Sequence, residues 1–237
     1  MSSADIRNPS SVAVDYDPFA DAPLARVVPS TEPQREIWLA AKLEPEASLA
    51  YNESVSLRLH GALDVVRLEV ALQSLIDRHE ALRATLGSTG EEFMIAEHAD
   101  LGTEVRDLSK LDANAREAEI AATLRRVVET PFDLEKGPLI RAEILSFGND
   151  DHLLVVTAHH IVCDGWSWGV LVNDLAALYR GGSALPAPDS FGDFAVAQAA
   201  EANSETHRAD EAYWLARFTG SVPSLDLPTD RPKARCW

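Results

Sequence analysis

The sequence lacks the features of a secreted or membrane-embedded protein. No apolar stretch approaches the ~20 residues that a membrane-spanning helix needs. The N-terminus carries neither the basic segment nor the apolar run of a secretory signal. Only two cysteines are present, Cys163 and Cys236, which excludes a disulfide framework, and their spacing fits no metal site. We therefore expect a cytoplasmic protein that binds no metal.

Positive charge is also scarce. The 21 Lys and Arg residues stand against 38 Asp and Glu residues, which gives a formal net charge of −17. Nucleic acids and anionic membranes attract proteins mainly through Lys and Arg, so this imbalance argues against both as partners. The remaining composition is that of a globular protein, with 46% hydrophobic and 25% charged residues. The 237 residues suit one large domain or two small ones.

The chain divides into three parts by composition. Residues 1–28 hold several Pro, Asn and Ser residues and show little periodicity, which predicts a flexible leader or linker. Residues 29–220 contain the periodic segments and form the expected ordered domain. Residues 221–237 are rich in proline and charge and are interpreted as the start of a further linker.

Strand and helix patterns are mixed along the ordered part. Residues 54–59 alternate between apolar and polar, which predicts a half-buried strand. Residues 139–147 and 152–157 predict a hairpin, because a Gly-Asn-Asp turn joins them. The other predicted elements are a strand at 92–96, helices that follow caps at Thr31 and Asp64, and helices at 113–129, 165–179, 191–202 and 205–218. This mixture indicates an α/β or α+β fold.

The densest chemical signal is a pair of histidines at the end of an apolar strand, followed by an Asp-Gly turn into a helix. Side chains alternate across a strand, so His159 and His160 should point to opposite faces. One imidazole can then face a reaction channel while the other packs inside the sheet. Histidine is the usual proton carrier near neutral pH. Because the two rings diverge, a shared metal ion is a poor fit.

The residues after the histidines have simpler interpretations beside the catalytic one. Asp164 can fix the turn, cap the next helix or pair with an arginine. Gly165 would allow a tight backbone path from strand to helix. Cys163 is interpreted as a small buried filler, because no activating partner beyond the histidines is evident.

Residues 159–165 (HHIVCDG) resemble the HHxxxDG motif of condensation domains in nonribosomal peptide synthetases, which belong to the chloramphenicol acetyltransferase-like superfamily. Further segments resemble motifs of the same family in the same order: TEPQREIW at 31–38, RHEALRATL at 78–86, PFDL at 131–134, FGDFA at 191–195 and LPTDRP at 227–232. The resemblance covers nearly all of the ordered chain, yet it matches only the N-terminal half of such a domain. It implies an N-terminal lobe at 29–220, with a mixed β-sheet and flanking helices, and the start of an inter-lobe linker at 221–237.

The resemblance also implies a mechanism and its residues. In the family, two lobes enclose a tunnel in which the amine of a carrier-bound acceptor attacks the thioester of a carrier-bound donor. It implies His160 as the reactive histidine, Asp164 as a structural residue of the same motif, and a backbone N–H of Gly165 near the reacting centre.

The remaining residues of the motif and its surroundings are expected in supporting roles. His159 is expected as a buried support, with Arg78 or Arg83 as the partner of Asp164. Trp166 and Ser167 are expected to line the substrate tunnel.

Partners follow from the same resemblance. The donor and acceptor peptidyl carrier proteins, the C-terminal lobe and neighbouring synthetase modules are the expected partners. The lobe itself is expected to bind no cofactor, since the substrates travel on the phosphopantetheine of the carriers. Despite the negative charge of the chain, Arg26, Arg125 and Arg126 are candidate docking residues. An isolated lobe is expected to be inactive.

Other functions remain open from the sequence. The chain could belong to an acyltransferase that uses coenzyme A, to an epimerisation-type domain, which also carries the double histidine, or to a non-catalytic docking module. The identity of the donor distinguishes the first alternative, and binding that survives loss of His160 distinguishes the last.

Overall fold

The structure is a computed structural model that describes residues 23–182, 185–202, 204–220 and 228. Its contacts divide the chain into two units, Met1–Val196 and Ala197–Trp237. The hydrophobic core lies in the first unit, between Val28 and Ala195. The leader predicted for 1–22 and nearly all of the linker predicted for 221–237 lie outside the described residues.

The described residues form strands and helices in mixed order, as predicted. The strands are β1 (Leu24–Pro29), β2 (Asn52–His60), β3 (Ala84–Leu86), β4 (Glu92–Ala96), β5 (Glu104–Asp107), β6 (Ile140–Ser146) and β7 (Asp151–His159). The helices are α1 (Glu32–Leu43), α2 (Pro45–Leu49), α3 (Val65–Arg78), α4 (Ala113–Glu129), α5 (Gly165–Tyr179), α6 (Phe191–Glu201) and α7 (Glu205–Arg217), with a 3-10 turn η1 (Glu80–Arg83). The predicted bounds of α4 and α5 are confirmed, and Asp64 caps α3 by accepting from the backbone of Arg67.

The larger sheet has four strands in the order β2-β7-β6-β5. Strand β7 pairs antiparallel with both β2 and β6, and β5 pairs parallel with β6. Because the central strand β7 is covered on both faces, it is almost entirely buried from His152 to His159. The predicted hairpin between 139–147 and 152–157 is confirmed as β6 and β7.

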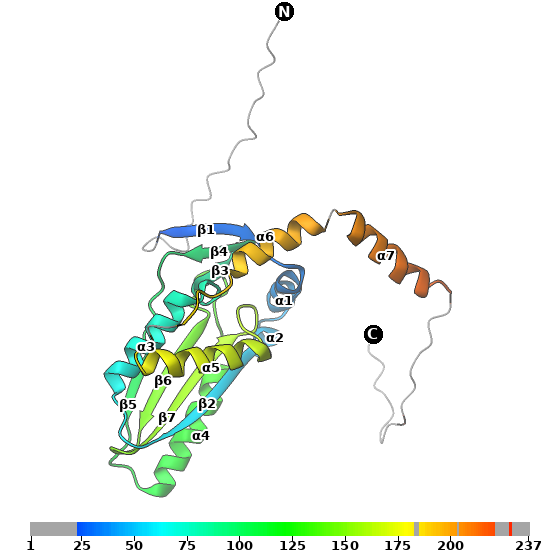
Figure 1. Cartoon of the computed structure of the whole chain (residues 1–237). Helices are drawn as coiled ribbons and strands as arrows, with labels where there is room; N and C mark the ends of the chain where they lie inside the picture. The colour runs from blue at the N-terminus through cyan, green and yellow to red at the C-terminus, as the bar shows by residue number, and fades with distance from the viewer. Residues whose placement is uncertain (1–22, 183–184, 203, 221–227, 229–237) are drawn as a thin grey trace, which may run out of the picture. The chain divides into compact units, whose positions relative to one another are not determined.

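Helices cover both faces of this sheet (Figure 1). Helices α3 and α5 pack on the face that carries Leu154 and Val156. Helix α4 packs on the opposite face, which carries Leu153 and Val155. The alternation predicted for β7 is therefore present in the core, and the α/β fold class is confirmed.

A second, three-stranded sheet has the order β1-β4-β3. Its first strand begins at Leu24, so the expectation of a linker up to residue 28 is wrong for residues 24–28. Only Val28 is buried in β1, and the strand is held by backbone pairing with β4. A strand with one buried side chain leaves almost no hydrophobic periodicity in the sequence.

Candidate active site

The predicted site lies where β7 ends and α5 begins. Strand β7 ends at His159, and Asp164 is the N-cap of α5, so residues 160–163 form the connection. The backbone N–H of His160 donates to the carbonyl of Tyr51 at 2.8 Å, which ties this connection to the start of β2. The side chain of His159 is fully buried, whereas that of His160 is 35% exposed. This difference agrees with the opposite directions predicted for the two rings.

The His159 imidazole is enclosed on the α4 face of the sheet. Its Nδ1 accepts from the backbone N–H of Ile161 at 3.2 Å, and its Nε2 lies 3.4 Å from Oγ of Ser48. The ring contacts the aromatic rings of Tyr51 and Phe132. Burial lowers the pKa of His159 to about 4, and the nearby charge of His160 acts in the same direction. This ring is therefore neutral at physiological pH.

The His160 imidazole faces the other way; it is hydrogen-bonded to the carbonyl of Cys163, and the carboxylate of Glu53 lies beside the same nitrogen as an ion-pair partner. Its Nδ1 lies 3.1 Å from the carbonyl oxygen of Cys163 and 2.9 Å from Oε1 of Glu53. Neither oxygen can donate, so Nδ1 carries the hydrogen in this arrangement. In the neutral ring, Nε2 then holds a lone pair that can accept a proton. The ring of Tyr51 stacks beside it, with centroids 6.4 Å apart.

Glu53 is a site residue that the sequence does not reveal. The register of the sheet explains its position, because Glu53 pairs with Ala158 across β2 and β7. Side chains two residues apart share a face of a strand, so Glu53 lies on the face of Ala158 and His160. Oε2 of Glu53 also accepts from the indole Nε1–H of Trp168 at 3.0 Å. The predicted strand at 54–59 begins one residue too late to include Glu53.

Asp164 caps helix α5 and makes no ion pair within the described part of the chain. Its Oδ1 accepts from the backbone N–H of Ser167 at 2.8 Å and from the Ser167 hydroxyl at 2.6 Å. The same hydroxyl accepts from the backbone N–H of Asp164 at 3.2 Å, which completes a capping box. These hydrogen bonds from Ser167 lower the pKa of the Asp164 carboxyl.

The predicted pairing of Asp164 with an arginine is wrong for both candidates. Arg78 forms an ion pair with Asp174 of α5 at 2.8 Å and also bonds the carbonyl of Pro186. Arg83 donates to the carbonyls of Asp77 and Ala96. The local cap satisfies Asp164 without any distant partner.

Gly165, Trp166 and Ser167 form the first turn of α5. Gly165 is exposed, and a Cβ added there would meet no atom within 4 Å. Its φ lies outside the left-handed range, so this backbone conformation is also open to other residues. Trp166 is 85% exposed, and Ser167 serves the cap.

Buried side chains also hold the connection formed by residues 160–163. The side chain of Gln34, on α1, donates to the carbonyl of Ile161 at 2.9 Å, while its Oε1 accepts from the backbone of Thr31. The sequence does not predict this support. Cys163 is buried, and burial raises the pKa of its thiol to about 12. The thiol is therefore no nucleophile at neutral pH, which agrees with its interpretation as a filler.

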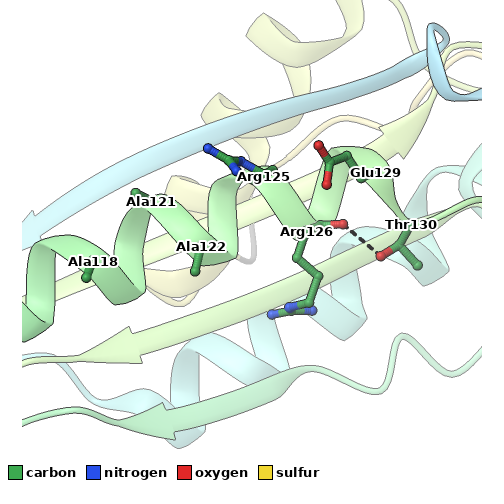
Figure 2. Close-up of a pocket in the computed structure, with 7 residues that line it drawn as sticks. All are labelled: Ala118, Ala121, Ala122, Arg125, Arg126, Glu129 and Thr130. Carbon is green, nitrogen blue, oxygen red and sulfur yellow. Dashed lines mark hydrogen bonds between the residues drawn. The ribbon is translucent and has the colours of Figure 1, made fainter.

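A separate hollow of about 460 Å³ lies along α4 and is lined by Ala118, Ala121, Ala122, Arg125, Arg126, Glu129 and Thr130 (Figure 2). Arg126 forms an ion pair with Glu143 at 2.6 Å. Arg26, the other docking candidate, forms one with Asp193 at 2.9 Å. Among the described residues, Arg125 has no hydrogen-bond or ion-pair partner. This hollow is formed by the helix on the His159 face of the sheet.

No group of three or more His, Cys, Asp and Glu side chains in the described part of the chain is placed to hold a metal ion. Within the same residues, no helix has the length and apolar character needed to cross a membrane.

Sequence comparison identifies a family and several relatives. The family described as "Condensation domain" matches residues 24–236. The chain is 37% identical over 228 residues to chondramide synthase cmdD of Chondromyces crocatus and 36% identical over 205 residues to tyrocidine synthase 3 of Brevibacillus parabrevis. These alignments cover 93% and 86% of this chain, but only 6% and 3% of the relatives. The chain therefore spans a small part of the length of these synthases.

Comparison with solved structures finds the same fold in condensation and cyclization domains. The starter condensation domain of the rhizomide synthetase RzmA matches with a TM-score of 0.72 and 25% identity, over 86% of this chain and 55% of that chain. The cyclization-docking bidomain of EpoB from Sorangium cellulosum matches with a TM-score of 0.75 over 87% of this chain and 41% of that chain. At 24% identity, the second match speaks for the fold alone.

Proposed function

The chain belongs to the condensation domain family, and from this membership we propose that it supplies one lobe of an amide-forming site. The donor is an acyl or peptidyl thioester on one peptidyl carrier protein, and the acceptor is the amine of an amino acid on another. Both substrates travel on phosphopantetheine arms of the carriers, and the lobe holds no cofactor of its own. Neighbouring modules of a synthetase, in the reducing cytoplasm, supply these carriers.

The observation that supports this proposal is the state of the His160 ring. Its Nδ1–H points to the carbonyl of Cys163, so the free lone pair is on Nε2. The ring is partly exposed at the end of a buried strand, where a substrate can approach one edge while the other is fixed. The lone pair on Nε2 of such a ring can accept a proton from an amine or orient that amine.

The reaction balances with this single imidazole. The acceptor nitrogen bonds to the donor carbonyl carbon, and the carbonyl oxygen becomes an oxyanion in a tetrahedral intermediate. When the C–O double bond returns, the C–S bond breaks and the pantetheine thiolate leaves. Nε2 of His160 takes the proton from the attacking nitrogen and returns it to the sulfur. Where the amine arrives neutral, the ring acts chiefly by orienting it and stabilising the intermediate.

The other residues of the motif have supporting parts in this proposal. Asp164 and Ser167 cap α5 and thereby fix the connection that carries His160. Gly165 leaves open space at the helix start, where a backbone N–H can face the oxyanion. Trp166 and Ser167, in the first turn of α5, are expected to line the path of the donor or acceptor arm. His159 supports the ring of its neighbour from inside the sheet.

The second lobe comes from the remainder of the family's domain. The part of the RzmA domain that matches this chain is about half of that domain. We propose that the 237-residue chain alone forms no amide bond, because the wall facing His160 belongs to the other lobe. Measurable product from the purified chain with both loaded carriers would contradict this.

The test replaces His160 in a complete two-lobe domain that contains this chain. With both carriers loaded, His160→Ala should lower the rate of amide formation by about 10²-fold or more. His98→Ala, which removes an exposed imidazole paired with Asp77, is the matched control and should keep full activity. Full turnover by His160→Ala, measured by intact mass of the acceptor carrier, would overturn the assignment.

The same assay separates the alternatives. Turnover of a coenzyme A ester without any carrier would instead favour a free-standing acyltransferase. Inversion at the α-carbon of the donor without amide formation would favour an epimerisation-type domain. Carrier binding that survives His160→Ala, with no product from either protein, would favour a docking module.

A further inference from the structure

We propose that Glu53 is a positioning residue that holds the His160 imidazole in the tautomer with hydrogen on Nδ1. The catalytic meaning of this inference rests on the proposed role of His160. The geometric part stands by itself, because it concerns the protonation site of one ring in the isolated chain.

The carboxylate of Glu53 connects three elements. Its Oε1 lies 2.9 Å from Nδ1 of His160, which follows β7, and its Oε2 accepts from Nε1 of Trp168 on α5 at 3.0 Å. Glu53 itself belongs to the edge strand β2. With both oxygens engaged, the carboxylate can turn only by giving up one of these contacts. Trp168 thus fixes Glu53, and Glu53 fixes His160.

Charge gives the carboxylate a second effect on the ring. A negative group beside Nδ1 favours a hydrogen there and disfavours a lone pair. When Nε2 takes a proton, the ring becomes cationic, and the same carboxylate stabilises that cation. The carbonyl of Cys163, at 3.1 Å, favours the same tautomer but carries no net charge. Glu53 therefore adds an electrostatic contribution that the backbone cannot replace.

A simple surface ion pair would behave differently. Exposed pairs contribute about 0–1 kcal/mol and tolerate loss of either partner. The Glu53 side chain is 33% exposed, so its charge is only partly screened, and its second oxygen is occupied by the indole of Trp168. The test must therefore read the ring nitrogens directly rather than stability.

The decisive measurement is the ¹⁵N spectrum of the histidine side chains in the 237-residue chain, recorded at about pH 9, where imidazoles are neutral. The His160 signals are assigned by their loss in His160→Gln. In the unmodified chain we expect Nδ1 to carry the hydrogen. In Glu53→Gln the amide oxygen turns to the Trp168 indole and the NH₂ group faces Nδ1. The ratio of Nδ1–H to Nε2–H tautomer should then fall by about fivefold or more.

Two control variants distinguish the effect of the position of Glu53 from the effect of losing one negative charge. Glu104→Gln removes the same charge from an exposed glutamate on β5, the opposite edge strand of the sheet, and should leave the tautomer ratio unchanged. Trp168→Phe keeps the carboxylate but frees its second oxygen, so the ratio should fall by a smaller factor. If Glu53→Gln gives the same ratio as Glu104→Gln, the Cys163 carbonyl alone sets the tautomer and the proposal is overturned.

Activity in the complete domain provides a second readout. Glu53→Gln should lower kcat by about 10- to 100-fold at little change in KM, which is less than the loss of His160 itself. Glu53→Asp, which restores the charge, should recover part of kcat. If His160→Ala is fully active while Glu53→Gln changes the tautomer, the proposed function fails and the positioning by Glu53 stands. If Glu53→Gln leaves the tautomer ratio unchanged while His160→Ala is inactive, the positioning by Glu53 is overturned and the proposed function stands.

Discussion

Two imidazoles joined by one peptide bond experience different surroundings. The ring of His159 lies in the sheet interior, where a charge would lose its hydration, and burial lowers its pKa to about 4. The ring of His160 lies at the surface of the lobe, against the carboxylate of Glu53. Strand alternation therefore places the His159 ring in the core and the His160 ring at the surface.

The pH dependence of stability should reveal the buried ring. The unfolded chain protonates His159 near its ordinary pKa of about 6.5, whereas the folded chain resists protonation until about pH 4. Its stabilising contribution is therefore complete above pH 6.5 and is lost as the pH falls toward 4. From pH 7.5 to 5.0 this costs about 2 kcal/mol of the free energy of unfolding.

His159→Asn keeps an acceptor for the Ile161 N–H but removes the titrating ring. Urea unfolding at pH 7.5 and 5.0 should show that this variant, though less stable, loses about 2 kcal/mol less than the unmodified chain on acidification. His207→Asn, on an exposed helix, gives the baseline for loss of a surface imidazole. Equal losses in the His159 variant and the unmodified chain would show that this ring is protonated in the folded state.

For single residues, the sequence predicts those positions that depend on the alternation of one strand. Alternation predicts that His159 and His160 point to opposite faces, and the family resemblance adds that His159 is the buried one. It does not identify Glu53, because a contact between residues 107 positions apart requires the register of β2 against β7. It also leaves open whether Asp164 is a cap or an ion-pair partner, because both use the same carboxylate. Only the hydrogen bonds from Ser167 decide between them.

Among the helices and strands, α5 matters most for the candidate site, because its N-terminus follows directly on the connection that carries His160. Its cap is a reciprocal pair between Asp164 and Ser167, and the connection that carries His160 enters the helix through it. A fixed helix start limits how far His160 can move, since only four residues separate His159 from the cap. Stability of this cap and placement of the ring are therefore linked.

Replacing Asp164 should lower the free energy of unfolding by as much as the loss of other helix N-caps does. Asp164→Ala should lower the free energy of unfolding by about 1 kcal/mol at pH 7.5, and Asp164→Asn should change it by less than about 0.5 kcal/mol. Because the folded pKa of Asp164 is lowered, this contribution is present above the ordinary carboxyl pKa and is lost as the pH falls through the lowered value. Asp64→Ala, at the cap of α3, is the matched control.

Double-mutant cycles test the assignment further. Asp164 should couple with Ser167 and show no coupling with Arg83, whose guanidinium donates to two carbonyls elsewhere. A coupling between Asp164 and Arg83 larger than that with Ser167 would contradict the cap.

Element boundaries are predicted best where a cap and a long period occur together. Helix α4 follows Asp112 and runs for 17 residues, and its bounds match the prediction. The short elements α2, β3 and β5, of three to five residues, are not predicted from the sequence. They have too few residues to establish a period, and pairing with neighbours determines their structure.

For the molecule as a whole, the core and the connection that carries His160 belong to one unit. Both hydrophobic clusters lie between Val28 and Ala195, and the order β2-β7-β6-β5 joins strands nearly 100 residues apart. That order could not be predicted from local patterns, which specify strands but not their neighbours. The net charge of −17 gives no strand order either, since charge affects solubility and association rather than fold.

Helix α6 belongs partly to this core, whereas α7 buries none of its residues. Gly192 of α6 donates its N–H to Glu80 at 2.7 Å, and Ala195 is 2% exposed. In α7 no side chain is buried, and its aromatic residues are exposed. The two helices should therefore contribute very differently to the stability of the first unit.

Truncation should separate the two contributions. A chain that ends at Ala202 keeps α6 and should unfold in urea within about 0.5 kcal/mol of the full chain, because none of the residues of α7 is buried. A chain that ends at Ser190 loses α6, exposes the packing surface of Ala195 and leaves the Glu80 carboxylate without the Gly192 N–H, so it should lose about 2 kcal/mol or more. Far-ultraviolet circular dichroism of both chains measures the difference. If the chain ending at Ala202 were as unstable as the shorter one, α7 would have to stabilise the lobe through contacts that its exposed side chains do not indicate.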